Sequence, residues 1–429
     1  MKGKLSIFYM LLLPMLTIGI SYGVTIYPLC VILLALGLFT TSKDTAGFYL
    51  LMFGGPIGGT FRIMYPSIPL YGMLLTLFGA ILMKRWFKQF WTEKRSAFKY
   101  LLAVFLVFLI SYVFAEHTAY ANHKIFQIVY HGSLMFWGFY VLQKSNKIEN
   151  EDLVQLILLS SITYVVFLVN YYRFTPGPLF DYNWLRTSLH AQEYIDQSAT
   201  VIGYQTVGMT ALLGITFLFS KKKLDIIPSA IYSCMAFQLI MMSSARQAIL
   251  GFVIIMFLRF AFFNSHMGIK KTLLFLLGFI VVYILYEFII ISGSEYIENM
   301  SETAGGGRDL IMLEAIRLFS QYPIFGVGLG GFAIHAAFLD VAWPHNFFLE
   351  ILCETGCVGV LALLLIVVAY MVNNKINFRI LTTTNCYYFL FATAIAIRTM
   401  VSGDLTESIE LFCFLFAVSN AFSTKKILK

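Results

Sequence analysis

The sequence predicts an all-α integral membrane protein, a bundle of helices that crosses the bilayer many times. Hydrophobic residues make up 59% of its 429 residues, charged residues make up only 12%, and the mean hydropathy is +0.80. A soluble domain needs a larger polar surface than this composition supplies. The apolar runs are continuous and lack the alternation of a membrane β-strand, so they predict helices, whose backbone groups all bond within one segment.

Many windows without a charged side chain have the length of a membrane helix, for which about 20 residues cross a hydrocarbon core of about 30 Å. The first window, residues 5–42, is too long for the core of a signal peptide and lacks a small-residue cleavage site, so it predicts retained helices. The other windows are 63–83, 100–115, 125–143, 153–172, 197–220, 226–245, 355–374 and 380–397. A weaker pair at 45–60 and 67–83 is interrupted by GGPIGG and Arg62 and could be tilted or re-entrant.

With the spans between these windows, the chain predicts 12–14 transmembrane helices in a single integral membrane domain, residues 1–429. No internal repeat and no appended soluble domain is evident. Residues 293–346 form the longest polar connection, which we expect to be a large periplasmic loop with short helices that carries part of an active site.

The basic residues are distributed unevenly over the connections, which predicts the orientation of the chain. Of the 30 lysines and arginines, 21 fall in one set of connections, which also includes both termini. These connections are predicted to be cytoplasmic, so the net charge of +8 reflects membrane topology and does not indicate nucleic-acid binding. The opposite ends of the spans carry a smaller group: Arg62, Lys124, Arg173, Arg186, Arg246, Arg308, Arg317 and Arg398.

Two arginines at these outer ends are candidate anion-binding residues. Arg246 lies in MSSARQAIL, in a tight turn between two spans, where an arginine is costly unless it faces a polar cavity or an anion. Arg308 follows three glycines and begins an amphipathic segment, RDLIMLEAIRLFSQYP, and its planar guanidinium suits phosphate oxygens. The alternatives are a snorkelling Arg246 and an ordinary loop arginine at 308.

The segment that begins at Arg308 predicts a helix with Leu310, Leu313 and either Ile316 or Arg317 in neighbouring rows, lying on the membrane-facing surface. A glycine-rich stretch, IFGVGLGGF, follows it and contains Gly326 and Gly328.

His345 stands where the polar loop meets an apolar run. Pro344 and Asn346 both suit the first turn of a helix, which places His345 at a helix N-terminus, where free N–H groups and the helix dipole favour an anion. Imidazole is also suited to accept a proton near neutral pH. The alternative is an interfacial histidine that bonds to lipid headgroups or to a neighbouring loop.

Three motifs resemble those of the bacterial O-antigen polymerase and O-antigen ligase superfamily. HNFFLEILCETGCVG is similar to its histidine-asparagine, nine-residue spacer and Gly-x-x-Gly signature, through His345, Asn346, Gly356 and Gly359. Arg308, Pro323, Gly326 and Gly328 resemble its pattern of arginine, helix, proline and Gly-x-Gly. RQAIL, which contains Arg246 and Leu250, resembles its arginine, three residues, leucine motif. These motifs cover residues 243–368.

The resemblance implies a glycosyltransferase of the bacterial inner membrane that transfers a glycan from undecaprenyl diphosphate on the periplasmic side, without a metal or other cofactor. His345 would be the general base and Arg246 and Arg308 would bind the diphosphate. Asn346, Gly326, Gly328 and the pair Glu350 and Glu354 would support the site; the glutamates could orient the histidine, contact the acceptor sugar or line a polar cavity. Expected partners are the lipid-linked oligosaccharide, membrane lipids and a chain-length regulator, but no nucleic acid.

The acceptor divides the superfamily: a polymerase uses a carrier-linked repeat unit, whereas a ligase uses lipid A-core. The length and polarity of the loops 172–198 and 293–344 favour a polymerase, because two carrier-linked glycans must be held. Tyr182, Trp184, Arg186 and His190 in the first loop could contact sugars. A transporter of lipid-linked oligosaccharide is the alternative of another class, but such proteins usually show repeats and ionisable residues near the bilayer midplane.

Two cysteines, Cys353 and Cys357, lie one helical turn apart. A zinc site would need further ligands at matching spacing, so helix packing is the preferred interpretation.

Overall fold

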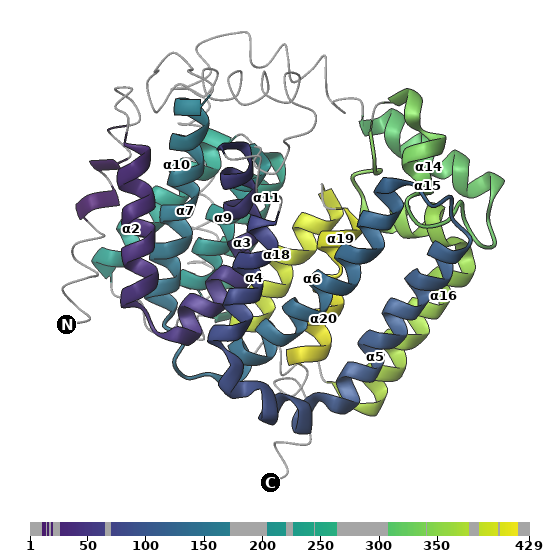
Figure 1. The fold of residues 1–429 in the computed structure, drawn as a ribbon, viewed down its shortest axis with the longest axis horizontal. Coiled ribbons are helices and arrows are strands. Elements are labelled where there is room, and N and C mark those ends of the chain that lie inside the picture. The colour runs from purple at the N-terminus through teal and green to yellow at the C-terminus, as the bar shows by residue number, and fades with distance from the viewer. Residues whose placement is uncertain are drawn as a thin grey trace. The chain divides into compact units, whose positions relative to one another are not determined.

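A computed structural model describes residues 11–13, 15–16, 19, 26–64, 70–171, 204–219, 226–243, 245–263, 308–339, 341–376, 386–401 and 404–418 (Figure 1). The described residues form helices and no β-sheet, as the sequence predicts, and the chain is an all-α polytopic membrane protein. The loop residues Tyr182, Trp184, Arg186 and His190, and residues 293–307 of the long connection, lie outside the described residues.

Four described helices are long and apolar enough to cross a membrane: Lys84–Val113, Ala119–Lys144, Asn150–Val169 and Phe347–Asn373. Six shorter apolar helices accompany them in the described part of the chain. The total of 12–14 crossings stays a prediction, because stretches such as 264–307 lie outside the described residues.

The chain divides into two compact units, each built from separate stretches of sequence. The first unit comprises residues 1–84, 145–298 and 386–394. Its helices are α2 (Tyr27–Thr40), α3 (Lys43–Met64), α4 (Tyr71–Leu82), α7 (Asn150–Tyr171), α9 (Tyr204–Phe219), α10 (Ile226–Ser243), α11 (Arg246–Phe263) and the beginning of α18 (Cys386–Val401).

Helix α7 is central to this first unit and packs against α2, α3, α9 and α10. Its residues from Leu153 to Val169 are buried around the whole circumference, as expected of a helix surrounded by other helices. Helices α3 and α4 approach very closely, because glycines face each other at their crossing: a Cβ on Gly58 would come within 2.2 Å of the Cα of Gly72. The GGPIGG stretch thus lies inside a continuous helix, α3, in which Pro56 is accommodated.

The second unit comprises residues 85–144, 299–385 and 395–429. It contains η1 (Lys84–Trp86, of which Lys84 belongs to the first unit), α5 (Phe87–Val113), α6 (Ala119–Lys144), α14 (Arg308–Gln321), α15 (Gly331–His335), η2 (Ala337–Leu339), α16 (Phe347–Asn373), the end of α18, α19 (Leu405–Ser408) and α20 (Glu410–Val418). Within it α5 packs against α6, α16 and α20, and α6 packs against α19 and α20. Helices α14 and α15 pack against α16 and against each other (Figure 1).

One end of this second unit carries several basic residues. Lys144, at the end of α6, forms an ion pair of 2.6 Å with Glu93 near the beginning of α5. Asn373, at the end of α16, donates a hydrogen bond of 2.7 Å to the hydroxyl of Tyr100 in α5. Lys84, Arg85 and Lys375 flank these same helix ends. The beginning of α16, which follows His345, therefore lies at the opposite end of the unit.

Candidate functional site

His345 precedes the first turn of α16 and has an unusual backbone conformation. The helix begins at Phe347, and Asn346 caps it: its side chain accepts a hydrogen bond of 3.1 Å from the Leu349 N–H. Pro344 and Asn346 thus come just before the first helical residue, not within the first turn. His345 itself has a φ of 52°, and its ring packs against Trp343 with centroids 5.1 Å apart. A positive φ at a residue other than glycine stores strain, a property that concentrates at functional sites.

Asn346 also joins α16 to a second element. Its amide nitrogen donates a hydrogen bond of 3.2 Å to the carbonyl of Met400, near the end of α18. The side-chain oxygen and nitrogen of the residue next to His345 are therefore both bonded within the protein, and its role in a site stays a prediction.

Helix α16 is broken at Gly356, which has φ 63° and ψ −170°. The glycine-rich loop fills the break. Val327 and Gly328 donate backbone hydrogen bonds of 2.8 and 3.1 Å to the carbonyls of Cys353 and Glu354, and Cys357 donates one of 2.9 Å to the carbonyl of Pro323. The loop thus satisfies backbone groups that the interrupted helix leaves without partners.

Gly326 and Gly328 are required by this close packing. Both have a positive φ, 70° and 85°, and a Cβ on Gly326 would lie 2.5 Å from the backbone carbon of Glu354. Gly356 is equally tight, since its Cβ would lie 2.3 Å from the carbonyl oxygen of Ile324. These glycines therefore allow the loop to pack against the first part of α16, the part that follows His345.

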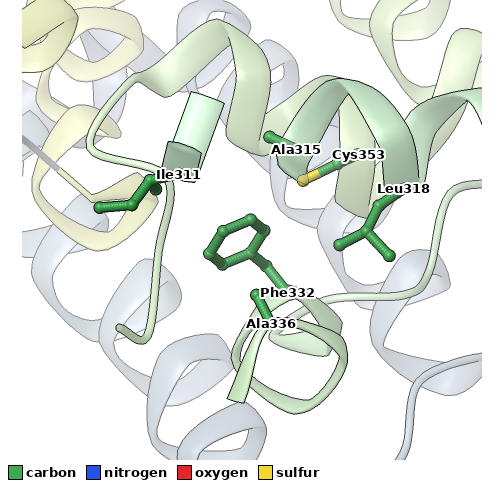
Figure 2. Close-up of a cluster of buried hydrophobic side chains, with 6 residues drawn as sticks. All are labelled: Ile311, Ala315, Leu318, Phe332, Ala336 and Cys353. Atoms are coloured by element: carbon green, nitrogen blue, oxygen red, sulfur yellow. The ribbon is translucent and has the colours of Figure 1, made fainter. Parts of the chain in front are cut away.

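Helix α14 begins at Arg308, as the sequence predicts, and carries two apolar faces. Ile311, Ala315 and Leu318 enter a buried cluster with Phe332, Ala336 and Cys353 (Figure 2). Figure 2 shows the ring of Phe332 in the middle of this cluster. The other face exposes Leu310, Leu313 and Ile316, which agrees with a helix whose outer surface meets lipid.

The same cluster brings the beginnings of α14 and α16 together. Ile311, one turn after Arg308, is a member, and Leu349, in the first turn of α16, packs against it. Cys353 is buried here, as expected of a helix-packing residue, whereas Cys357 is exposed beyond the break and does not belong to the cluster. The backbone of Arg308 and His345 thus flanks one core, although the Arg308 side chain lies outside the described residues.

Arg246 begins α11 in the first unit, and its side chain is also outside the described part. Because Arg308 and His345 belong to the second unit, the convergence of all three residues stays a prediction.

A buried ionic cluster lies one turn beyond His345 and includes a residue that the sequence did not single out. Glu350 and Glu354 are fully buried, and so is Lys124 of α6. The Lys124 Nζ donates hydrogen bonds of 2.6 Å to Glu350 Oε1 and 2.8 Å to each carboxylate oxygen of Glu354. The sequence places Lys124 among the basic residues at the outer ends of the spans, directly before the charge-free window 125–143, and gives no sign of its partners.

A second ionic cluster joins α6 to the C-terminal helices. Arg398 of α18 lies 2.8 Å from Glu410 and 3.6 Å from Glu407, and Glu410 also lies 2.9 Å from the imidazole of His131. Lys124 and His131 thus link α6 to different neighbouring helices through buried carboxylates. Buried ion pairs of this kind can specify which helices pair and in which register.

Comparison with known proteins agrees with the motifs. Residues 231–364 match the family model described as O-antigen ligase, and this range contains Arg246, Arg308, the glycine-rich loop and His345. A search of curated proteins finds no match. The match over residues 231–364 thus supports the resemblance of this membrane protein to the O-antigen polymerase and O-antigen ligase superfamily.

Proposed function

We propose that this protein is an O-antigen or surface-polysaccharide polymerase of the bacterial inner membrane. It transfers the growing glycan from undecaprenyl diphosphate to a carrier-linked repeat unit. The observation that carries the proposal is the strained His345 at the capped end of α16, within the family match and away from the basic end of its unit.

In the proposed reaction His345 accepts the proton of the acceptor hydroxyl, whose oxygen attacks the anomeric carbon of the donor. The bond between that carbon and the diphosphate oxygen breaks, undecaprenyl diphosphate leaves, and the configuration is inverted. Arg246 and Arg308 bind the diphosphate and stabilise the negative charge that develops on it. No metal or other cofactor takes part.

The distribution of basic residues supports a cytoplasmic location for both termini and a periplasmic location for the site. Membrane lipids surround the apolar helices, and a chain-length regulator is a further expected partner. We place the carrier's diphosphate at the depth of the lipid headgroups, where Arg246 and Arg308 would bind it.

Ligation to lipid A-core is the second candidate, because the matched family model is described as O-antigen ligase. The lengths of the connections 172–198 and 293–344 favour polymerisation, which must hold two carrier-linked glycans.

The lipid-linked products that accumulate in cells without the protein distinguish the two. Carrier bearing single repeat units is the expected result. Accumulation of carrier with long chains would show a ligase instead. Product formation by the purified protein in vesicles, with carrier-linked repeat units as the sole substrate, separates an enzyme from a transporter, which would move these lipids unchanged.

A further inference from the structure

The first nine residues of α16, Phe347–Thr355, form a segment that the rest of the helix does not hold in place. Gly356 interrupts the helix, and Cys357 and Val358 bond to the carbonyls of Pro323 and Ile324 in place of the preceding turn. The direction of this segment therefore depends on contacts with other elements. His345 and its neighbour Asn346 stand at the beginning of the segment, where the Asn346 side chain donates a hydrogen bond of 3.2 Å to the carbonyl of Met400.

Besides the apolar packing of Leu349 and Cys353 and the bond from Asn346 to Met400, two kinds of polar contact hold the segment. Along its backbone, the Val327 and Gly328 N–H groups and the Ser111 hydroxyl donate to the carbonyls of Cys353 and Glu354. Through its side chains, Glu350 and Glu354 both bind the Nζ of Lys124 in α6. The backbone contacts lie at the end next to Gly356, whereas Glu350 lies in the first turn, five residues from His345.

Lys124 binds both acidic side chains of the segment and joins them to α6. All three side chains are fully buried, so water does not screen their interaction. Three acceptor oxygens surround the ammonium group, matching its three N–H donors. Without the lysine, two carboxylates one turn apart would face each other in an apolar interior and would push the first turn of α16 away from α6.

We infer that Lys124 is a positioning residue: its ammonium group, bound between Glu350 and Glu354, fixes the first segment of α16 and thereby the imidazole of His345. Lys124 does not touch substrate; it acts on the reaction through the direction of one short helical segment. This inference rests on the function proposed above, in which His345 is the base.

Kinetics of the purified enzyme in vesicles test the inference. Lys124→Met keeps the length of the side chain and removes the charge. We expect kcat to fall by about 10- to 100-fold, because a displacement of about 1 Å at a reacting group has such an effect, while the KM for the lipid-linked donor stays within about twofold. Lys124→Arg, which retains the charge and the donors, should recover part of kcat.

A matched control is Lys94→Met, since Lys94 is also a buried lysine but lies near the basic end of α5. It should leave kcat unchanged. A purely structural Lys124 would give less folded protein but a normal kcat per folded molecule, and that result would overturn the inference. If Lys124→Met does not fold, Glu354→Gln offers the same comparison, because it keeps the shape and weakens the bridge.

A distance measurement tests the positioning without any reaction. Nitroxide labels at Phe348, in the first turn of α16, and at Leu106 of α5 would occupy exposed positions, 56% and 54% accessible. We expect a narrow distance distribution in the parent protein and a shifted or broadened one in Lys124→Met. An unchanged distribution would overturn the inference whatever the activity. Conversely, Lys124→Met could broaden the distribution although the parent protein forms no glycan. That result would support the positioning role of Lys124 and refute the proposed function.

Discussion

At the scale of single residues, His345 combines a reactive side chain with a conformation that the fold imposes. We expect His345→Ala to insert normally and to bind undecaprenyl-diphosphate glycan, but to lose about 10²- to 10⁴-fold in rate, because only the proton transfer is removed. His117→Ala is a matched control, since His117 is exposed in the turn between α5 and α6. Donor binding and single-turnover rates in vesicles check both variants; a near-normal rate in His345→Ala would exclude the base.

Arg308 provides a second test at this scale. If Arg308 binds a diphosphate through two parallel hydrogen bonds, Arg308→Lys should lose most of the activity although the charge is kept. An ammonium group cannot reproduce the planar pair of N–H donors of a guanidinium. Arg317→Lys on the same helix is the control: Arg317 forms a two-pronged pair with Glu314, which raises the pKa of the Arg317 guanidinium. Activity is compared at equal protein abundance. Full activity in Arg308→Lys would reduce Arg308 to a general cation.

At the scale of elements, the break in α16 and the glycine-rich loop form one unit of structure. Alanine at Gly356 would have to adopt a positive φ, which costs about 1–3 kcal/mol, and its Cβ would collide with the carbonyl of Ile324. We therefore expect Gly356→Ala to lower the thermal midpoint in detergent and to reduce activity. Gly55→Ala in α3 is the control, because a Cβ there meets nothing within 4 Å. Equal midpoints for the two variants would contradict this account of the break.

The elements also show what local sequence can and cannot predict. The start of α14 at Arg308 follows from an amphipathic pattern after three glycines, which is a local signal. The break at Gly356 depends on a loop about 30 residues upstream, whose carbonyl and N–H groups replace those of the helix. Periodicity carries no information on such a partner. The sequence therefore indicated two glycine motifs, Gly326 with Gly328 and Gly356 with Gly359, but not that the loop of the first contacts the helix of the second.

At the scale of the whole molecule, composition alone predicts the membrane class and the helical fold, because the bilayer leaves the backbone few alternatives. The pairing of Lys124 with Glu350 and Glu354 could not be predicted in the same way. It joins residues more than 200 positions apart and depends on which helices are neighbours. A lysine that directly precedes a charge-free window could equally face solvent, and only the packed fold shows that Lys124 is buried between two carboxylates.

The proposed reaction yields the last prediction, that Arg246, Arg308 and His345 meet at one periplasmic cavity. A single diphosphate must contact both arginines while the base stands beside the anomeric carbon, so α11 must bring Arg246 to the beginnings of α14 and α16. In a variant whose native cysteines are replaced, cysteines at positions 246 and 308 should react with a membrane-impermeant maleimide from the periplasm, and carrier-linked glycan should slow that reaction. A short bifunctional maleimide should also link the two positions. A cysteine at either position that reacts only from the cytoplasm would refute the shared site, and labelling that the glycan does not slow would refute the binding of its diphosphate there.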